Sequence, residues 1–300
     1  MTLNPAIDVT YRTERLLPGS GHRVAESAQC AGGKGINVSR ALRLMGHDAV
    51  AIGLAGGATG AAIAAELTGA GVPHDFVSVA GPSRTTVTII EDSGRATLLR
   101  EPGPPIAQSE WVALKHKVYT LLDRADVVVL AGSVPPGIPI EAYAELLAIT
   151  GGRVPTVLDA DGSALCSALI ARPTAIKPNA DELRAATGIA EAGAAARNLC
   201  HRGAGAVYAS LGANGILGCT AQGTWRLAAP RCAVVNPTGA GDAAVAAIAT
   251  GIAEGLPTPM VITRAVAWSA AAVVQPQAGV IDPRVVDAHL AVLAAPTEVR

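Results

Sequence analysis

Residues 125–160 read ADVVVLAGSVPPGIPIEAYAELLAITGGRVPTVLDA, and this stretch decides the fold class. Two short apolar runs, ADVVVLAG at 125–132 and PTVLDA at 155–160, flank the alanine- and leucine-rich stretch PIEAYAELLAITG at 139–151. The apolar runs lack the alternation of polar residues that marks a half-exposed strand, so they predict strands that are buried on both faces. A buried strand, a helix and a second buried strand in succession are typical of a parallel sheet covered by helices.

The same order of elements continues on both sides of this stretch. Further strands are predicted at AVAIGLAG (49–56), PTAIKPN (173–179), GAVYASLG (205–212) and GILGCT (215–220). Further helices are predicted at INVSRALRLMG (36–46), TGAAIAAELTGAG (59–71), SEWVALKHKVYTLLDRA (109–125) and ADELRAATG (180–188). We therefore expect an α/β protein with a doubly wound, mainly parallel sheet that helices cover on both faces, in a single domain spanning residues 1–300.

Two stretches depart from this pattern, residues 9–30 and residues 84–102. Both alternate apolar and polar residues, which indicates strands with one face in solvent, and EDSG at 91–94 suits a hairpin turn. We expect the two stretches to meet in a small β-sheet that forms a lid, the alternative being two unrelated surface hairpins. An uncovered strand edge in such a lid would favour a homodimer.

The bulk composition excludes several classes of protein. Of the 300 residues, 50% are hydrophobic and the formal net charge is -1, so the chain can bury a large core and has no general attraction for nucleic acid or a membrane surface. The five cysteines lie far apart in sequence, which argues against a disulfide framework and a zinc site. No apolar run is long enough to span a bilayer, and MTLNPAIDVTYR at 1–12 has no basic region followed by an apolar stretch, so we expect a cytoplasmic protein. A local cluster of cations could still bind a small anionic substrate.

The segment NPTGAGD at 236–242 precedes an alanine-rich run that predicts a helix starting near Gly241. Glycines at this junction leave backbone N–H groups uncovered at the positive end of the helix dipole, where they can bind a phosphate. Asp242 then has two interpretations. It is either a carboxylate placed favourably in a first helical turn, or a general base that accepts the proton of a substrate hydroxyl during phosphoryl transfer.

Four more segments place glycines or polar residues after predicted strands. GGKGIN at 32–37 offers close backbone approach with Lys34 as a point charge, although a solvated loop lysine would fit equally. In KPNADEL at 177–183, Asn179 and Glu182 predict either a helix capping box or a site that holds Mg²⁺ near phosphates. SLGANG at 210–215 is either a plain hairpin turn or the rim of a nucleotide groove. LAGGATG at 54–60 again places glycines between a strand and a helix, and with NPTGAGD and GGKGIN it suggests a ligand crevice at the carboxyl ends of the strands.

In chain order, ten segments resemble the ribokinase-like (PfkB) family of carbohydrate kinases, and they span nearly the whole chain. The segments are TLNPAID (2–8), GGKGINVSRAL (32–42), GGATG (56–60), SRTT (83–86), PGPPI (102–106), AGSVPPG (131–137), LDADGSAL (158–165), KPNADEL (177–183), SLGANG (210–215) and NPTGAGD (236–242). The resemblance implies a ribokinase-like fold with a β-sheet lid above an α/β core. Within the family, TLNPAID, GGKGIN and PGP are most similar to the sugar-phosphate branch, which comprises 1-phosphofructokinase, tagatose-6-phosphate kinase and the minor 6-phosphofructokinase.

The resemblance also implies a role for each matching residue. Asp242 is the implied catalytic base, and the backbone of Gly239, Ala240 and Gly241 is the implied anion hole. The residues implied to bind the sugar phosphate are Asp8, Gly33, Lys34, Asn37, Arg84 and Arg100, with Lys34 and Arg84 holding its phosphate and Arg100 adding a further contact from the lid. The residues implied to bind ATP are Lys177, Asn179, Ser210, Gly212 and Gly215, and Asn179 with Glu182 is implied to organise Mg²⁺. Alternatively, Arg100 binds no ligand and only projects from an exposed strand.

The resulting expectation is an ATP- and Mg²⁺-dependent kinase that converts fructose 1-phosphate to fructose 1,6-bisphosphate. Tagatose 6-phosphate and fructose 6-phosphate are the alternative acceptors, and a non-catalytic sugar-phosphate binder is a remoter alternative that should lack the base or the anion hole. A dinucleotide-dependent oxidoreductase is disfavoured because GxGxxG does not follow the first strand. Departures from the family pattern are Thr86, where Asn is common, and Asn236, where potassium-dependent members carry Asp, so a monovalent-cation site is not expected. The chain also starts in the middle of the expected first strand.

Overall fold

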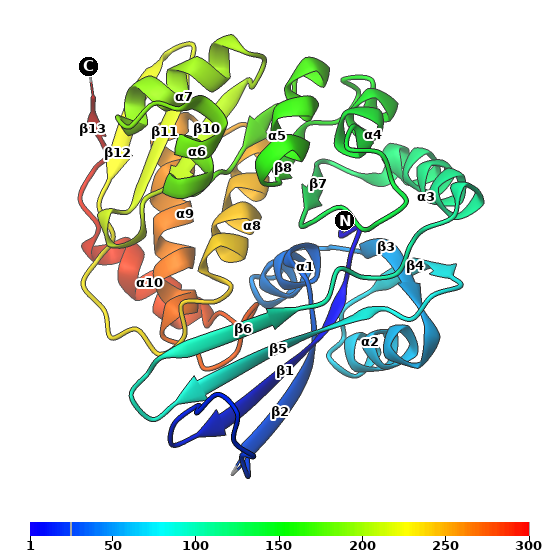
Figure 1. Ribbon diagram of the computed structural model, residues 1–300. Coiled ribbons are helices and arrows are strands. Elements are labelled where there is room, and N and C mark those ends of the chain that lie inside the picture. The colour runs from blue at the N-terminus through cyan, green and yellow to red at the C-terminus, as the bar shows by residue number, and fades with distance from the viewer. Residues whose placement is uncertain (25, 300) are drawn as a thin grey trace.

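The computed structural model describes residues 1–24 and 26–299 (Figure 1). Its α-helices are α1 (Lys34–Leu44), α2 (Gly57–Gly69), α3 (Gln108–Leu121), α4 (Ala142–Thr150), α5 (Gly162–Ala168), α6 (Ala180–Thr187), α7 (Ala192–His201), α8 (Ala240–Ala253), α9 (Thr258–Val273) and α10 (Pro283–Val292). Its strands are β1 (Ala6–Thr13), β2 (Glu26–Gly32), β3 (Ala51–Gly56), β4 (His74–Val79), β5 (Arg84–Glu91), β6 (Ala96–Arg100), β7 (Val128–Ala131), β8 (Thr156–Asp159), β9 (Ala175–Ile176), β10 (Ala206–Ser210), β11 (Ile216–Thr220), β12 (Gly223–Leu227) and β13 (Thr297–Glu298). Short 3₁₀ turns lie at Leu122–Arg124, Leu169–Ala171 and Gly212–Asn214.

The central sheet has the strand order β13-β12-β11-β10-β9-β8-β7. Strands β7 to β10 are parallel, as the alternation of strands and helices predicts, whereas β11, β12 and β13 each pair antiparallel with their neighbours. The sheet is therefore mixed rather than mainly parallel. The reason is the short turn at 212–214, which leaves no room for a crossover helix between β10 and β11, so the chain must reverse direction.

Strand β9 is much shorter than the predicted strand over residues 173–179. Only Ala175 and Ile176 join the ladder, because Pro173 and Pro178 have no N–H group to donate to a neighbouring strand. The carbonyl of Pro178 instead accepts a hydrogen bond from the Ser210 amide. This contact brings the ends of β9 and β10 together.

The parallel pair β3–β4 continues this layer on the other side of β7, and the backbone of Met1 and Thr2 joins the two parts. The Thr2 amide donates to the Ile52 carbonyl, and the Met1 carbonyl accepts from the Ala131 amide. This short stretch therefore runs between β3 and β7.

Helices cover both faces of the central sheet, as the fully apolar strands predict (Figure 1). One core packs α1, α8 and α9 against the sheet, and the other packs α3, α4, α5 and α7 against the opposite face. Within residues 1–24 and 26–299, no helix is long and apolar enough to cross a membrane. The doubly wound α/β class is confirmed.

The two alternating stretches meet in a separate sheet with the order β2-β1-β5-β6. Strands β5 and β6 form the hairpin predicted at 91–94, and β1 pairs parallel with β5 although the two lie far apart in sequence. Ile7, Val9 and Ala31 from one face of this sheet share an apolar cluster with Ile63 and Leu67 of α2. The opposite face of the small sheet carries its polar side chains.

Candidate active site

The amino terminus of α8 exposes backbone N–H groups, as the glycines before it predict. Gly239 adopts a left-handed conformation with φ 89°, and a Cβ atom added there would lie 2.9 Å from the Gly279 nitrogen, so only glycine fits. Gly239, Ala240 and Gly241 are all partly exposed. Because the first amides of a helix have no acceptor within it, this turn presents N–H donors and the positive end of the helix dipole to solvent.

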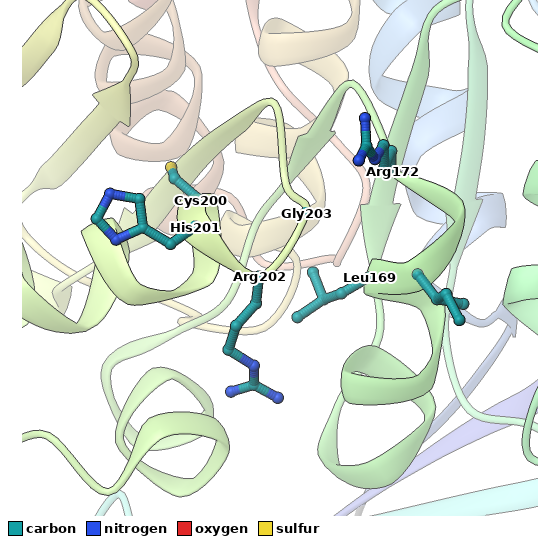
Figure 2. A pocket seen from close by; sticks show the side chains of 7 residues that line it. Leu169, Arg172, Cys200, His201, Arg202 and Gly203 are labelled. Carbon is teal, nitrogen blue, oxygen red and sulfur yellow. The ribbon is translucent and has the colours of Figure 1, made fainter.

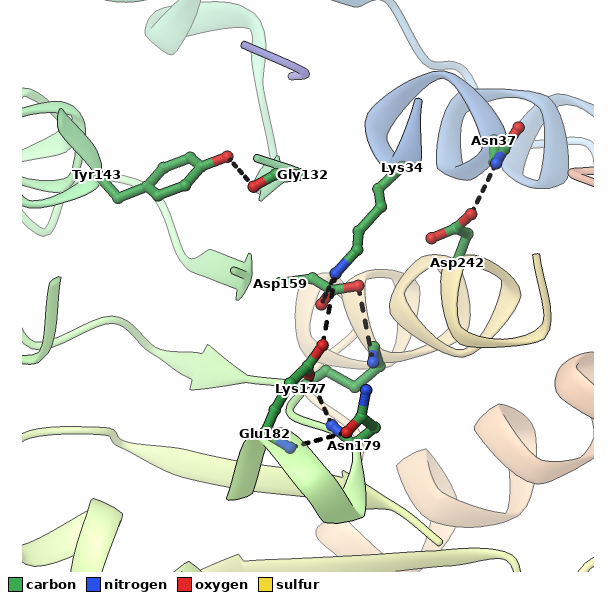
Figure 3. Close-up of polar contacts among 9 residues, drawn as sticks. All are labelled: Lys34, Asn37, Gly132, Tyr143, Asp159, Lys177, Asn179, Glu182 and Asp242. Carbon is green, nitrogen blue, oxygen red and sulfur yellow. Dashed lines mark hydrogen bonds and ion pairs between the residues drawn. The ribbon is translucent and has the colours of Figure 1, made fainter. Parts of the chain in front are cut away.

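Asp242 lies in the first turn of α8 and is 7% exposed. Its Oδ2 accepts a hydrogen bond of 2.7 Å from Nδ2 of Asn37 on α1 (Figure 3). Burial and the negative charge of Asp159 raise the pKa of Asp242 to about 6, while Asn37, Lys34 and Lys177 oppose this rise. The carboxylate is therefore buried among polar and charged groups rather than in an apolar core. Its pKa near neutrality suits a general base.

Two lysines converge on one buried carboxylate beside Asp242 (Figure 3). Asp159 is 1% exposed, and its oxygens lie 3.0 Å from Nζ of Lys34 and 3.6 Å from Nζ of Lys177. The Lys34 ammonium also lies 3.9 Å from a Glu182 oxygen. Burial alone would lower the pKa of Lys34, but Asp159 and Glu182 raise it above its ordinary value, so Lys34 is charged.

Lys177 also borders the exposed amides of α8. A Cβ atom added at Gly241 would lie 3.6 Å from Nζ of Lys177. The sequence predicted Lys177 as part of a nucleotide groove, and the structure brings its charge to the edge of the predicted anion hole. Such a combination of a cation and helix N–H groups favours a phosphate or a transferring phosphoryl group.

Asp159 was not among the residues predicted for the site. It ends the apolar strand β8, and a polar residue at the carboxyl end of a parallel strand is a common signal of a ligand site. That signal was present in PTVLDA, but the sequence does not say that two lysines from α1 and from the segment after β9 meet at this carboxylate. The structure adds Asp159 to the candidate residues.

Asn179 and Glu182 form the predicted capping box at the start of α6. Oδ1 of Asn179 accepts from the Glu182 amide at 2.8 Å, and Oε2 of Glu182 accepts from the Asn179 amide at 2.8 Å. The second Glu182 oxygen, Oε1, is the atom near Lys34 (Figure 3). The capping box thus leaves one Glu182 oxygen facing the cluster of charged side chains.

The turn 210–215 is a tight hairpin turn between β10 and β11. Ser210 lies beside Asn179 in a parallel bridge, so two of the residues predicted to contact ATP are neighbours. Gly212 and Gly215 have φ of 58° and 80°, and a Cβ atom added at Gly215 would lie 1.9 Å from the Leu227 carbonyl oxygen. The structure therefore accounts for both glycines by backbone conformation and close packing.

On the small sheet, the structure brings Asp8, Arg84 and Arg100 to the polar face. Asp8 is opposite Thr86 on β5, and Thr86 is opposite Arg100 on β6. Burial raises the pKa of Asp8, and Arg84 is the strongest of the charges that oppose this rise. Burial lowers the pKa of Arg84, which donates to the backbone carbonyls of Asn4 and Glu101.

The polar face of the small sheet is turned toward the loop that packs on Gly239. Cys30, opposite Asp8, has its pKa raised by burial and by the Asp8 charge, and Arg40 and, less strongly, a hydrogen bond with the Gln277 side chain oppose this rise. The next residues of that loop, Ala278 and Gly279, contact Gly239.

Lys34 is the predicted substrate residue whose surroundings differ from those expected. It was predicted to hold the substrate phosphate together with Arg84, but its ammonium contacts Asp159 and Glu182. Gly33, which precedes it, has φ 112°, and a Cβ atom added there would lie 3.2 Å from the Thr2 hydroxyl oxygen. The predicted residues thus fall into two groups, one at the carboxyl ends of the central strands and one on the small sheet.

The donor set limits how a divalent cation could bind. Among residues 1–24 and 26–299, no group of three or more His, Cys, Asp or Glu side chains is arranged to hold a metal ion. The residues near Lys34 fit only a Mg²⁺ ion held mainly by substrate phosphates and water, with Glu182 Oε1 as one outer contact.

Two shallow cavities of about 440 and 450 Å³ lie away from Asp242, one at residues 169–172 and 200–203 (Figure 2) and one on the small sheet.

Known carbohydrate kinases are similar to this chain in sequence. Residues 2–284 match the family model described as pfkB family carbohydrate kinase. A tagatose-6-phosphate kinase of Staphylococcus epidermidis is 33% identical over 261 residues, and the match covers 84% of this chain and 84% of that protein.

Solved structures share the architecture over almost the whole chain. Phosphofructokinase-2 from Escherichia coli, in complex with potassium, superposes with a TM-score of 0.90 at 28% identity, covering 97% of this chain and 96% of that chain. The same Escherichia coli enzyme has been solved in complex with fructose-6-phosphate and in a tetrameric inhibited form. Ribokinase of Arabidopsis thaliana shares the fold, with a TM-score of 0.77 at 21% identity over 96% of both chains.

Proposed function

Because this chain belongs to the pfkB family of carbohydrate kinases, and is therefore an ATP-dependent sugar-phosphate kinase, we propose that its acceptor is a ketohexose phosphate and its product a ketohexose bisphosphate. The observation that carries the proposal is Asp242, a buried carboxylate of raised pKa at the mouth of a helix whose amides are exposed. Fructose 1-phosphate is the first acceptor to consider, because TLNPAID and GGKGIN resemble the 1-phosphofructokinases. Tagatose 6-phosphate is the second, and the 33% identity with a tagatose-6-phosphate kinase favours it.

In the proposed reaction, Asp242 accepts the proton of the acceptor's primary hydroxyl group. The hydroxyl oxygen attacks the γ-phosphorus of ATP in line, the bond from that phosphorus to the bridging oxygen breaks, and ADP leaves. The hydrogen bond from Asn37 holds the carboxylate of Asp242 in one orientation. At a pKa of about 6, Asp242 is largely ionised at neutral pH and remains basic enough to take the proton.

Charge that develops on the transferring group would be stabilised by the N–H groups of Gly239, Ala240 and Gly241. Lys177, next to Gly241, would add a positive charge. Lys34 would exchange its contact with Asp159 for a phosphate oxygen. A lysine held between two carboxylates can bind an anion of higher charge, such as a phosphate, when that anion enters the site. Asp159 would hold Lys177 in position throughout, and Lys34 until the phosphate binds.

The nucleotide would lie along Asn179, Ser210, Gly212 and Gly215, whose segments are adjacent. Mg²⁺ bound to the ATP phosphates would neutralise part of their charge, and Glu182 would hold it through water. The capping box supports this arrangement because it fixes Glu182 while one of its oxygens remains directed at the cluster.

The phosphate that the substrate already carries would bind to Arg84 and Arg100 on the small sheet. Guanidinium groups bind phosphate oxygens in a bidentate manner, and Asp8 on the neighbouring strand β1 would accept hydrogen bonds from the sugar hydroxyls. The small sheet, residues 9–30 and 84–102, would act as a lid whose closure excludes water from the γ-phosphate and so limits hydrolysis of ATP. The three candidate acceptors all carry a phosphate at one end and a primary hydroxyl at the other.

We also expect a cytoplasmic homodimer that forms through the lid. The edge strands β2 and β6 are open to pairing, and Leu98 and Leu99 on β6 are exposed. Sedimentation equilibrium of the wild-type protein and of a Leu99→Lys variant tests this assembly, since the charge should dissociate the dimer.

The decisive test of the acceptor is a panel of fructose 1-phosphate, tagatose 6-phosphate, fructose 6-phosphate and the unphosphorylated sugars, assayed for ADP release. One of the three phosphates should give the highest kcat/KM. Salt should raise the KM for that phosphate by screening its contact with the arginines. If an unphosphorylated sugar is the best acceptor, the roles proposed for Arg84 and Arg100 are wrong.

A further inference from the structure

Two cysteines that are distant in sequence meet in the fold. All five cysteines are free thiols, and the Sγ atoms of Cys200 on α7 and Cys219 on β11 lie 3.8 Å apart. The Cys200 thiol also lies 3.5 Å from the Cys219 carbonyl oxygen. Because both residues belong to packed elements, the two sulfur atoms are held near each other by the native fold.

One of these two cysteines is accessible from the surface. Cys200 is partly exposed and lines the cavity of about 440 Å³, together with His201, Arg202 and Gly203 (Figure 2). Cys219 is 1% exposed. Cys200 is therefore the more accessible of the two cysteines to a small reagent.

The buried cysteine has the character of a nucleophile. Hydrogen bonds from the Cys200 thiol and, less strongly, from the Thr224 hydroxyl hold the pKa of Cys219 below its usual value against the effect of burial. The same hydrogen bond, together with burial, raises the pKa of Cys200, so Cys200 reacts with an oxidant only after its proton has passed to the adjacent Cys219 sulfur. A thiolate attacks an oxidised sulfur faster than a thiol does. Cys219 is thus suited to resolve an oxidised Cys200.

We propose that Cys200 and Cys219 form a modification site, at which hydrogen peroxide converts the two thiols to a reversible intramolecular disulfide. In the first step the Cys200 sulfur attacks one peroxide oxygen, the O–O bond breaks, and a sulfenic acid and one water molecule form. In the second step the Cys219 sulfur attacks the Cys200 sulfur, the S–O bond breaks, and the disulfide and a second water molecule form. The two thiols lose two electrons and two protons, and the peroxide is reduced to water.

The geometry requires only a local adjustment. A disulfide bond is about 2.05 Å long, so the two sulfur atoms must approach by roughly 1.8 Å, which side-chain rotation and small shifts of α7 can supply. The bond closes a ring over residues 200–219 that contains β10 and the turn 210–215. Closing this ring reduces the conformational freedom of the unfolded chain, so the oxidised protein should be the more stable form.

The test treats the native protein with hydrogen peroxide and maps disulfides by mass spectrometry without reduction. We expect a loss of two of the five thiols per chain, a mass decrease of about 2 Da, and one cross-linked peptide pair containing Cys200 and Cys219. Dithiothreitol should reverse all three changes, and the melting temperature should be higher before its addition than after. Cys200→Ser should abolish the cross-link, whereas Cys166→Ser should retain it.

Oxidation in urea provides the matched control for the role of the fold. There the five cysteines should cross-link in a mixture of pairs, while the native protein should give the single pair. The proposal is overturned if the native protein keeps all its thiols, if Cys200 stops at a sulfenic or sulfinic acid without cross-linking, or if another pair is the main product.

Discussion

Replacement of Asp242 by Asn should make the folded protein more stable at pH 8. Asp242 has a pKa of about 6 in the folded chain against an ordinary value of 3.8, with burial as the main cause and the Asp159 charge second. A carboxyl group whose pKa is raised by folding adds stability while it is protonated. That contribution is complete below pH 4 and is lost as the pH rises through 6.

The magnitude follows from the pKa values. A rise from 3.8 to about 6 corresponds to about 3 kcal/mol of unfolding free energy that the wild-type protein loses when Asp242 ionises. An Asn side chain is neutral at every pH and can still accept the hydrogen bond from Asn37. We therefore expect Asp242→Asn to unfold with a free energy up to about 3 kcal/mol higher than the wild type at pH 8, and with little difference at pH 4.

Urea denaturation of the wild type and of Asp242→Asn at pH 4, 6 and 8 measures this difference. The matched control is Asp287→Asn, which removes a carboxylate from an exposed position on α10 and should change stability little at any pH. A variant that is less stable than the wild type at pH 8, or a gain that is the same at pH 4 and pH 8, would refute the reasoning.

The other expectations concern catalysis and binding. The kcat/KM of the wild type should fall about tenfold between pH 7 and pH 5, because Asp242 titrates near pH 6. Asp159→Asn should shift this fall to lower pH, because it removes a neighbouring negative charge that raises the pKa of Asp242. If the fall stays at the same pH in the variant, the titrating group is the substrate phosphate rather than Asp242. Arg84→Ala should raise the KM for the sugar phosphate by roughly 10- to 100-fold and leave the KM for ATP unchanged. The control Arg12→Ala, on the same sheet, should change neither KM. Equal effects of the two variants would contradict the role of Arg84. Glu182→Gln should keep the helix cap and raise the Mg²⁺ concentration needed for half-maximal rate, with Asp181→Asn as the neighbouring control; an unchanged Mg²⁺ requirement would remove Glu182 from the metal site.

Much of the fold could be predicted from the periodicity of apolar residues. Strands buried on both faces, such as β7 and β8, produce continuous apolar runs, and strands with one polar face, such as β5, produce alternation. The PfkB resemblance is confirmed by a family match over residues 2–284. Strand direction was harder to predict, because an apolar run looks the same in a parallel and an antiparallel strand. The reversal between β10 and β11 followed from a turn too short for a crossover.

The candidate site was predictable where the interacting residues lie within one short segment of the sequence. The capping box of Asn179 and Glu182 lies within four residues, and the glycines before Asp242 adjoin the helix that they expose. Contacts between distant segments were not predictable in this way. The ion pairs that join Asp159 to Lys34 and Lys177 depend on how α1, β8 and β9 are assembled, and so does the approach of Cys200 to Cys219.

The central claim is that Asp242 accepts the proton of the attacking hydroxyl beside the amides of Gly239, Ala240 and Gly241. The most direct test is a single-turnover measurement of phosphoryl transfer by Asp242→Asn with the best acceptor, together with calorimetric titration of ATP and of the sugar phosphate. We expect the rate of transfer to fall by about two to four orders of magnitude while both ligands still bind. A variant that binds both ligands and transfers the phosphoryl group at the wild-type rate would contradict the account.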